Sequence, residues 1–357
     1  MTTPAPRHTP GDDGAHAGAL ALDVVALGES MVTFLPTRPG RLADVPSFDR
    51  AIGGAESNVA CMLAAAGHRV RWVSRVGTDG FGDHLVETIG AHGVDVTHVQ
   101  RDPDRPTGVY FRTAGERGTD AHEVAYYRAG SAASAMSPVT VDLGAARAGR
   151  VLHLSGITAA LSDGCRELLH ALTAHGPGRP LVSFDVNHRP GLWRSPAGPG
   201  VLLDLARAAD LVFVGEDEAE QAWGVTGGPR AIRALLPEPA TLVVKHGERG
   251  ATALSDAAPA TSVPALRVDV TATTGAGDAF AAGFLHATLR GLPPHARLRH
   301  GHLWAAAALT TPGDLAAPPA RAHADRLAAL DDAAWETLRV GPGWTHAEQA
   351  EEEGATP

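Results

Sequence analysis

The sequence predicts an α/β fold with a doubly wound, mostly parallel sheet flanked by helices. Three observations predict it. Short apolar runs alternate with helical patterns of about a dozen residues through most of the 357 residues. The runs are apolar at consecutive positions, which is typical of strands buried on both faces of a parallel sheet. Polar residues follow several runs directly, at the carboxyl edge of the sheet where ligands of such folds bind.

Along the chain, the expected strands and helices follow one another in βαβ order. The expected strands are DVVALG (23–28), RVRWVSRVG (69–77), RVLHLSG (150–156), PLVSFDV (180–186), DLVFVG (210–215) and TLVVKHG (241–247). The clearest expected helices are ESNVACMLAAAG (56–67), FGDHLVETIGAHG (81–93) and DGCRELLHALTAHG (163–176).

Two segments, residues 31–51 and 106–128, interrupt this alternation. Both have strand-like runs with turn residues between them and no helical pattern. We interpret them as an antiparallel flap inserted into the α/β body, which would cover a substrate of the size of a sugar. A dimerisation sheet is the alternative, and the two roles are compatible.

Composition indicates an ordinary soluble protein with one folded domain over residues 21–340. The net charge is −10 and no Lys/Arg-rich block occurs, so we expect neither a nucleic-acid nor a membrane partner. The two cysteines, Cys61 and Cys165, lack C-x-x-C spacing, which argues against a disulfide framework and favours the cytoplasm. Residues 1–20 and the acidic residues 341–357 are expected to be disordered tails.

The stretch TTGAGDAF (273–280) combines very small residues with a carboxylate at the expected start of a helix. Backbone N–H groups in a first turn carry partial positive charge, and Gly275, Ala276 and Gly277 would let an anion such as a phosphate approach them. Asp278 then lies beside the anion as a base. A Gly-rich turn with an acidic cap is the alternative. The chain's single lysine, Lys245, has no glycine before it, which excludes a Walker-type loop.

Two separated motifs carry a resemblance to a known family. GGAESNVACMLAAAGHRVRWVSRVG (53–77) and TTGAGDAFAAGFL (273–285) resemble the motifs of the ribokinase-like (phosphofructokinase B-type) carbohydrate kinases, and the similarity runs from about residue 22 to about residue 335. The resemblance implies a doubly wound body with a small β lid. It also implies transfer of the ATP γ-phosphate, helped by Mg²⁺, to a primary hydroxyl of a sugar.

Within this family the chain is most similar to 2-keto-3-deoxygluconate kinases. The similar stretches are YYRAGSAASAMSP (126–138), LHLSGITAALS (152–162), FDVNHRPGLW (184–193) and PGDLAAPP (312–319). The implied substrate is a sugar acid, whose carboxylate calls for planar arginine donors. The resemblance assigns substrate binding to Gly53, Gly54, Asn58, Tyr110, Tyr126, Arg128, Arg189 and Asp314. Considered without the family, Arg128 is equally well a surface arginine.

For the phosphoryl transfer, the resemblance makes Asp278 the general base for the C6 hydroxyl and Gly275, Ala276 and Gly277 the anion hole. It assigns ATP binding to Asn187, Glu218, Lys245, Gly247, Gly250 and Thr274. Glu218 would organise Mg²⁺ through water, although Gly215 stands where the family has an asparagine. A solvated helix start is the alternative for Glu218, and a tight turn between two strands is the alternative for the segment around Lys245.

Two departures from the family pattern concern the nucleotide side. Ala272 stands where many relatives have an acid that helps to bind a monovalent cation, so we expect little K⁺ dependence. His302 stands near the place where relatives often have an asparagine beside the adenine.

Three functions remain open on the sequence. The first is an ATP-dependent 2-keto-3-deoxygluconate kinase, the second a kinase for a neutral sugar such as fructose or ribose, and the third a non-catalytic sugar-acid sensor. The lid strands lead us to expect a homodimer or larger assembly.

Overall fold

The computed structural model describes residues 21–113, 123–193, 196–256 and 258–346. The expected N-terminal tail, residues 1–20, lies outside the described residues. Residues 347–357 of the expected C-terminal tail also lie outside them. The first residues of that tail, 341–346, are described and include a short 3-10 helix, Trp344–His346, so the expected disorder does not begin at residue 341. Within the described part, no helix is long and apolar enough to cross a membrane.

The main sheet has nine strands in the order β13-β12-β11-β10-β9-β8-β1-β4-β5. The strands from β5 to β11 in this order pair in parallel, whereas β12 and β13 are antiparallel additions at one edge. Their bounds are β1 Leu22–Leu27, β4 Val70–Gly77, β5 Val99–Asp102, β8 Gly149–Ser155, β9 Leu181–Asp185, β10 Leu211–Gly215, β11 Thr241–Lys245, β12 Ala251–Ser255 and β13 Ala258–Val263. The predicted mostly parallel sheet is confirmed, and each of the six expected strands is one of these.

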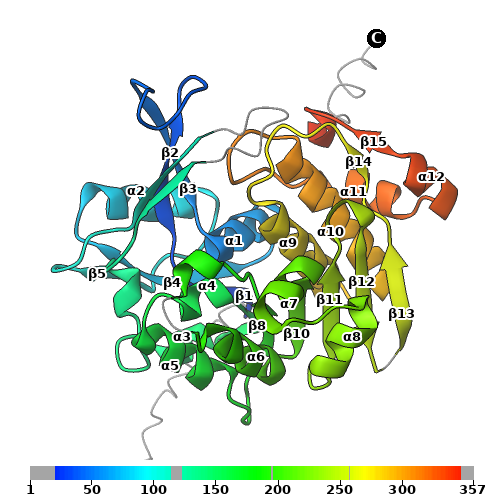
Figure 1. The fold of residues 1–357 in the computed structure, drawn as a ribbon, viewed down its shortest axis with the longest axis horizontal. Helices are drawn as coiled ribbons and strands as arrows, with labels where there is room; N and C mark the ends of the chain where they lie inside the picture. Colours follow the sequence, from blue (N-terminus) through cyan, green and yellow to red (C-terminus); the bar gives the residue numbers. More distant parts are fainter. Residues whose placement is uncertain (1–20, 114–122, 194–195, 257, 347–357) are drawn as a thin grey trace, which may run out of the picture.

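A separate four-stranded sheet, which we call the lid, stands away from the main sheet (Figure 1). Its order is β3-β2-β6-β7, with bounds β2 Met31–Pro36, β3 Phe48–Gly53, β6 Val109–Arg112 and β7 Val124–Tyr127. The predicted small inserted sheet is therefore confirmed. It is not purely antiparallel as expected, because β2 pairs with β6 in parallel.

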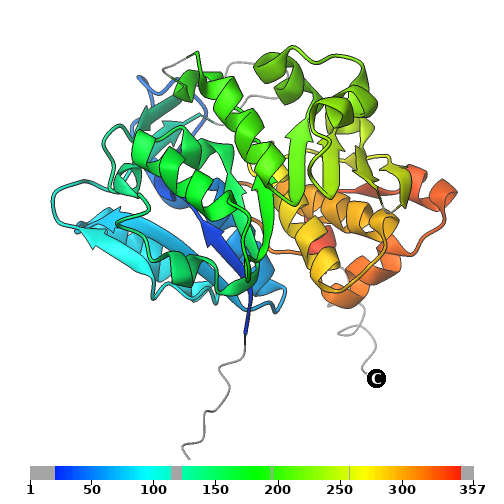
Figure 2. The ribbon, with the colours of Figure 1, turned by 90° about the horizontal axis from the view of Figure 1, so that it is seen from below.

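Helices cover both faces of the main sheet. One face carries α1 Ala55–Ala65, α2 Gly80–Ala91, α9 Ala276–Leu289, α10 Pro294–Leu309, α11 Arg321–Ala328 and α12 Asp332–Thr337. The other carries α3 Leu143–Ala146, α4 Gly156–Ala159, α5 Asp163–Thr173, α6 Gly198–Ala208, α7 Glu216–Trp223 and α8 Gly228–Leu235. Figure 2 shows the two halves of the chain side by side along this sheet, blue to green and yellow to red.

Strand β10 illustrates why the apolar runs are continuous. Leu211 and Phe213 pack into the core beneath α9 and α10, whereas Val212 and Val214 pack into the core on the opposite face. Successive side chains of a strand point to opposite faces, so a strand between two helical layers must be apolar at every position. A small pair, β14 Arg267–Val268 with β15 Arg339–Val340, completes the sheet structure.

Candidate active site

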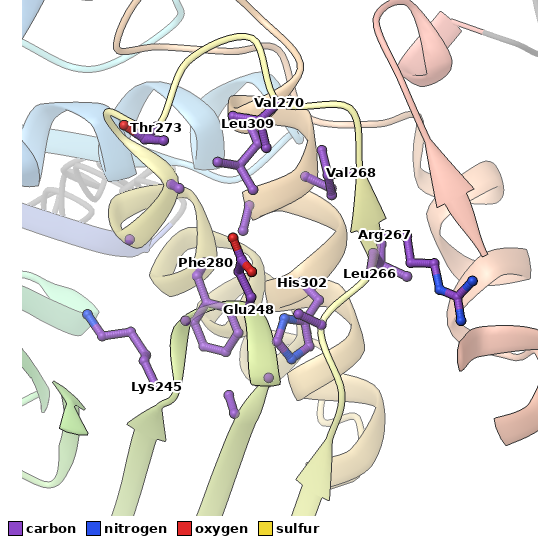
Figure 3. Close-up of a pocket in the computed structure, with 18 of the residues that line it drawn as sticks. Lys245, Glu248, Leu266, Arg267, Val268, Val270, Thr273, Phe280, His302 and Leu309 are labelled. Atoms are coloured by element: carbon purple, nitrogen blue, oxygen red, sulfur yellow. The ribbon is translucent and has the colours of Figure 1, made fainter. Parts of the chain in front are cut away.

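Two cavities meet at the carboxyl edge of the main sheet. The lid cavity, of about 340 Å³, lies between the lid and the body. The α10 cavity, of about 750 Å³, lies against α9 and α10. Lys245, Thr273 and Gly277 line both cavities, and we call this meeting place the seam. Figure 3 shows Lys245 and Arg267 on opposite sides of the α10 cavity.

The structure brings all of the predicted site residues to these two cavities. The lid cavity is lined by Gly53, Gly54, Asn58, Tyr110, Tyr126, Arg128, Asn187, Arg189, Glu218, Lys245, Thr274, Gly275, Gly277, Asp278 and Asp314. The α10 cavity is lined by the remaining three, Gly247, Gly250 and Ala276.

Helix α9 begins at the seam. Its N-cap, Gly275, has φ +80°, a left-handed conformation that side-chain-bearing residues rarely adopt. A Cβ at Gly277 would meet nothing nearer than the Lys245 amine at 3.8 Å, so the first turn is open to a ligand there. Gly275 differs, because a Cβ there would lie 2.3 Å from the backbone oxygen of Asp314. Close packing against residue 314 therefore already requires this glycine, and its predicted contact with a phosphate stays a prediction.

Asp278 lies in the first turn of α9 and is partly buried. The Asn58 side-chain amide donates a hydrogen bond to its Oδ2 at 2.9 Å. Burial raises the pKa of the Asp278 carboxyl to about 7, with the Asn58 hydrogen bond opposing the shift and the charge of Asp185 adding to it. A carboxyl with this pKa is poised to accept a proton near neutral pH.

Lys245 ends β11 and points at Asp185, the last residue of β9, with its Nζ 3.1 Å from Oδ1. Burial alone would lower the pKa of the Lys245 amine. The charges of Asp185, Glu218 and Asp278 outweigh burial and raise it, so the amine is a cation. The seam therefore presents one fixed positive charge beside the open N-terminus of α9.

On the lid side, two residues of β6 converge on Asp314. Tyr110 donates its hydroxyl to Oδ2, and Arg112 forms an ion pair with Oδ1. Gly53 is necessary for this arrangement, because a Cβ there would lie 2.1 Å from the Tyr110 hydroxyl oxygen. Tyr110 and Arg112 are two positions apart on one strand, so both side chains project from the same face of the lid.

The two predicted carboxylate-binding arginines differ in their surroundings. The side chain of Arg128 is only 10% exposed and forms an ion pair with Glu29, so it is not a surface arginine. Its guanidinium also lies 5.8 Å from the centre of the Tyr126 ring. Arg189 is 57% exposed, and its Nη1 lies 3.8 Å from Glu218.

Glu218 caps its own helix, because its Oε2 accepts a hydrogen bond from the Gly215 backbone N–H at 2.7 Å. Glu218 thus caps the start of its helix with one oxygen. Its other oxygen, Oε1, faces Arg189 and the lid cavity. Beside it, Asn187 has φ +40°, and its buried side-chain oxygen makes no hydrogen bond within the described residues. A strained residue with an unused acceptor is typical of a ligand site.

The segment after β11 is a tight turn that also lines the α10 cavity. The His246 backbone N–H donates to the oxygen of Gly250 at 2.8 Å. Gly250 is packed, since a Cβ would lie 2.2 Å from the Val263 oxygen, whereas Gly247 has open space beside it. The tight turn is therefore present, with Gly250 required by packing and Gly247 facing the cavity, while nucleotide binding at these glycines stays a prediction.

His302, on α10, lines the α10 cavity next to Phe280, with ring centres 5.2 Å apart (Figure 3). Its Nε2 lies 3.1 Å from the Val263 oxygen, so it must donate, which leaves Nδ1 without a proton. Burial lowers the pKa of His302 to about 4 and keeps the ring neutral at pH 7. Apolar side chains, among them Leu266, Val268 and Leu309, make up much of the remaining wall.

Three charged residues that line the lid cavity were not predicted, namely Glu29, Arg112 and Asp185, and neither was the buried Glu56 of α1. Glu29 and Asp185 lie at or just after the carboxyl ends of β1 and β9. That position could have identified them. Arg112 could have been found from its two-residue spacing to Tyr110. Nothing in the sequence distinguishes Glu56 as a site residue, because acids are common in the first turn of a helix.

Glu56 is fully buried and lies under Gly28, where a Cβ would be 2.1 Å from the carboxyl carbon. The Thr158 hydroxyl donates to its Oε1 at 2.6 Å, and its Oε2 has no partner within the described residues. Burial raises the pKa of Glu56 to about 8, against the effect of the Thr158 hydrogen bond, so the group is mostly protonated at neutral pH.

Chemically, the arrangement combines a proton acceptor with an anion site. Asp278 faces the lid cavity, which is polar and lined by arginines, tyrosines and acids. The α10 cavity, larger and more apolar, opens at the same helix terminus. Such a pair of cavities can hold a hydroxyl compound on one side and a phosphorylated one on the other, with the reacting groups meeting at the seam.

Comparisons with known proteins give a consistent result. The model of the pfkB family of carbohydrate kinases matches residues 21–321. The 2-dehydro-3-deoxygluconokinase of Bacillus subtilis is 34% identical over 310 residues, covering 85% of this chain and 94% of its own. The enzyme of the same name from Thermoproteus tenax is 33% identical over 317 residues, covering 88% and 96%. Fructokinase-2 of Zea mays is 34% identical over 267 residues, covering 73% and 78%.

Solved structures have the same fold. A PfkB protein from Polaromonas sp. JS666 has a TM-score of 0.74 at 34% identity and covers 85% of this chain and 99% of its own. A protein described as a ribokinase II from E. coli, in complex with ATP and Mg²⁺, has a TM-score of 0.75 at 23% identity and covers 85% and 98%.

Proposed function

Because the chain belongs to the pfkB family of carbohydrate kinases, we propose that it transfers the γ-phosphate of ATP to the C6 hydroxyl of 2-keto-3-deoxygluconate, also called 2-dehydro-3-deoxygluconate. The observation that carries the proposal is the seam: a polar cavity and an apolar one meet at the N-terminus of α9, with Asp278 on the polar side. The polar cavity suits the sugar acid and the apolar one suits the nucleotide.

The arginines of the lid cavity support a sugar acid. Arg112, Arg128 and Arg189 all line it, and a carboxylate is the ligand that planar guanidinium groups bind best. Arg128 and Arg189 are the candidates for the substrate carboxylate, as the family resemblance implies. Arg112 and Arg128 are each already paired with one acid, Asp314 and Glu29 respectively, whereas Arg189 is largely exposed. The relatives named as 2-dehydro-3-deoxygluconokinases are matched over nearly their whole length, which agrees with this choice.

In the proposed reaction, Asp278 accepts the proton of the C6 hydroxyl as that oxygen attacks the γ-phosphorus, and the bond from the γ-phosphorus to the β,γ-bridging oxygen breaks to release ADP. Asn58 holds the carboxylate through its 2.9 Å hydrogen bond. The first-turn N–H groups of α9 and the Lys245 ammonium stabilise the negative charge of the group in transfer. The tight packing of Gly275 against residue 314 fixes where these N–H groups point.

Mg²⁺ fits this site as an ion bound mainly through phosphate oxygens and water. No group of three or more His, Cys, Asp or Glu side chains that could hold a metal occurs in the described part of the chain. Mg²⁺ commonly keeps several waters and uses one or two protein oxygens. The unused oxygen of Asn187 and the carboxylate of Glu218 are the groups that would hold it. When bound, Mg²⁺ neutralises charge on the phosphates.

Two further expectations concern the nucleotide side. His302 would accept a hydrogen bond from the adenine amino group through Nδ1, because Nε2 is committed to Val263. With Ala272 in place of an acid, we propose that K⁺ raises the rate little over Na⁺.

A fructokinase is the second candidate, because Fructokinase-2 of Zea mays is as similar in identity, though over less of the chain. A neutral sugar would leave Arg128 and Arg189 without a ligand carboxylate. Replacement of these arginines would then change KM for the sugar little.

The test is ADP release with ATP and Mg²⁺ on 2-keto-3-deoxygluconate, fructose and ribose. We expect turnover on the sugar acid, reduced about 10²–10⁴-fold by Asp278→Asn. The matched control is Asp204→Asn on α6, an exposed position outside both cavities. Turnover on a neutral sugar alone would contradict the substrate. Ligand-induced thermal stabilisation without ADP formation would instead favour the sensor.

A further inference from the structure

We propose that Glu29 is a positioning residue that fixes the guanidinium of Arg128 in the orientation needed to bind the carboxylate of the substrate. The inference rests on the sugar-acid substrate proposed above. Glu29 follows β1 of the body and Arg128 follows β7 of the lid, so the pair joins the two sheets across the cavity.

The Glu29 carboxylate is buried and uses both of its oxygens. Its side chain is 1% exposed. Oε1 accepts a hydrogen bond from the Ser131 hydroxyl at 2.5 Å, and Oε2 accepts one from Arg128 Nε at 2.7 Å. Oε2 also forms an ion pair with Nη2 of the same arginine. Breaking this pair would leave an uncompensated buried charge, so the pairing holds the two groups together.

The surrounding backbone holds the Glu29 carboxylate in place. A Cβ at Gly108 would lie 3.0 Å from Oε1, and a Cβ at Gly54 would lie 2.6 Å from the Glu29 backbone oxygen. Two glycines thus allow the chain to close around Glu29 on both sides. A carboxylate confined in this way can set the orientation of its partner.

Among the residues that the structure describes, the pair with Glu29 leaves one edge of the Arg128 guanidinium without a partner. A guanidinium presents five N–H donors, and Glu29 occupies the edge formed by Nε and Nη2. The outer edge, which includes Nη1, remains for a second carboxylate, and Arg128 lines the lid cavity. Two acids can therefore share this arginine, one from the protein and one from the substrate.

Arg128 differs in this respect from the other two arginines. Arg112 donates through Nη2 to Asp314, while its buried Nε has no hydrogen-bond partner among the described residues. Arg189 is largely exposed and only loosely paired with Glu218. Arg128 alone among the three combines a fully paired inner edge with a position on the cavity wall. A pre-oriented donor binds with a smaller entropy cost, so Glu29 contributes to substrate affinity without touching the substrate.

The experiment compares two substrates that differ only at C1: 2-keto-3-deoxygluconate and 3-deoxyfructose, in which a hydroxymethyl group replaces the carboxylate. Steady-state kinetics are measured for the wild type, Glu29→Gln and Glu29→Asp. The matched control is Asp102→Asn, which breaks another buried carboxylate–arginine pair, with Arg75, outside both cavities. Thermal unfolding of every variant reports stability separately.

For Glu29→Gln we expect kcat/KM to fall about 10- to 100-fold on the sugar acid, mainly through KM, and less than about threefold on 3-deoxyfructose. Glu29→Asp should recover part of the loss, and it decides the matter if the glutamine variant does not fold. Asp102→Asn should lower the unfolding temperature without changing the ratio of kcat/KM between the two substrates. If Glu29→Gln lowered kcat/KM by the same factor on both substrates, or did not lower it on the sugar acid, the positioning role would be overturned.

The wild type tests the proposed function separately. If it phosphorylates 3-deoxyfructose as well as the sugar acid, or does not use the acid, the substrate assignment fails whatever the Glu29 variants do. If it prefers the acid and Glu29→Gln keeps that preference, only the inference about Glu29 fails.

Discussion

At the scale of single residues, the pKa of Asp278 determines how the rate depends on pH. The carboxyl must be deprotonated to act as a base, and burial has raised its pKa to about 7. We expect kcat/KM to rise with pH through a midpoint near 7. The hydrogen bond from Asn58 lowers this pKa, so Asn58→Ala should move the midpoint to higher pH. A pH–rate profile of both proteins checks this, and an unshifted midpoint in the variant would contradict the assignment of the base.

Glu56 should make folding less stable as pH rises. Its pKa is about 8 in the folded protein against an ordinary value of 4.5, so the folded state binds the extra proton. The free energy of unfolding then decreases from about pH 4.5 to pH 8, by a few kcal/mol at most. Glu56→Gln has nearly the same side-chain shape but does not titrate. This variant should therefore be more stable than the wild type at pH 8. Urea unfolding at pH 5 and pH 8 measures the difference, which should be small at pH 5.

The residues that could be predicted from the sequence were those within recognisable motifs, such as Asp278 and Asn58. Those that were missed form pairs between distant segments. Glu29 and Arg128 are 99 positions apart, and Arg112 and Asp314 are 202 apart. A sequence shows that a carboxylate is present, but the fold decides which arginine it meets.

At the scale of elements, the start of α9 depends on Gly275. Gly275→Ala would place a methyl group 2.3 Å from the Asp314 oxygen at φ +80°. Gly291, at the other end of α9, has φ +72° with open space around it. We expect Gly291→Ala to cost about 1 kcal/mol of stability through strain alone. Gly275→Ala should cost more and also lower kcat, because the first turn shifts. Thermal unfolding and turnover of both variants test this, and equal effects would argue against the packing role.

The elements themselves were largely predictable, because a strand between two helical layers is apolar at every position. β10 shows this directly, with alternate side chains in two different cores. The parallel pairing of β2 with β6 was not predictable. Alternation within a segment indicates a strand, but it does not indicate which strand lies beside it.

At the scale of the whole molecule, the lid presents an exposed edge strand. Val124 and Tyr127 of β7 are 43% and 66% exposed. No further strand lies beside β7 in the part of the chain that the structure describes, and exposed apolar side chains on such an edge favour association. We predict that two copies of the chain form a homodimer through the lid. Analytical ultracentrifugation measures the dimer, and Tyr127→Arg should weaken it. Val139→Arg, at a 94% exposed position outside the lid, should leave it unchanged. A monomeric wild type would contradict the prediction.

The position of Lys245 has a practical consequence. It carries the only side-chain amine of the chain and lies where the two cavities meet. Because neighbouring carboxylates keep that amine protonated, acylating reagents should react with it slowly. Any labelling of a side-chain amine must nevertheless occur at this one position. An amine-directed mass tag located on Lys245 by peptide mapping, which separates it from a tag on the α-amino group, therefore reports on occupancy of the seam with no engineered probe.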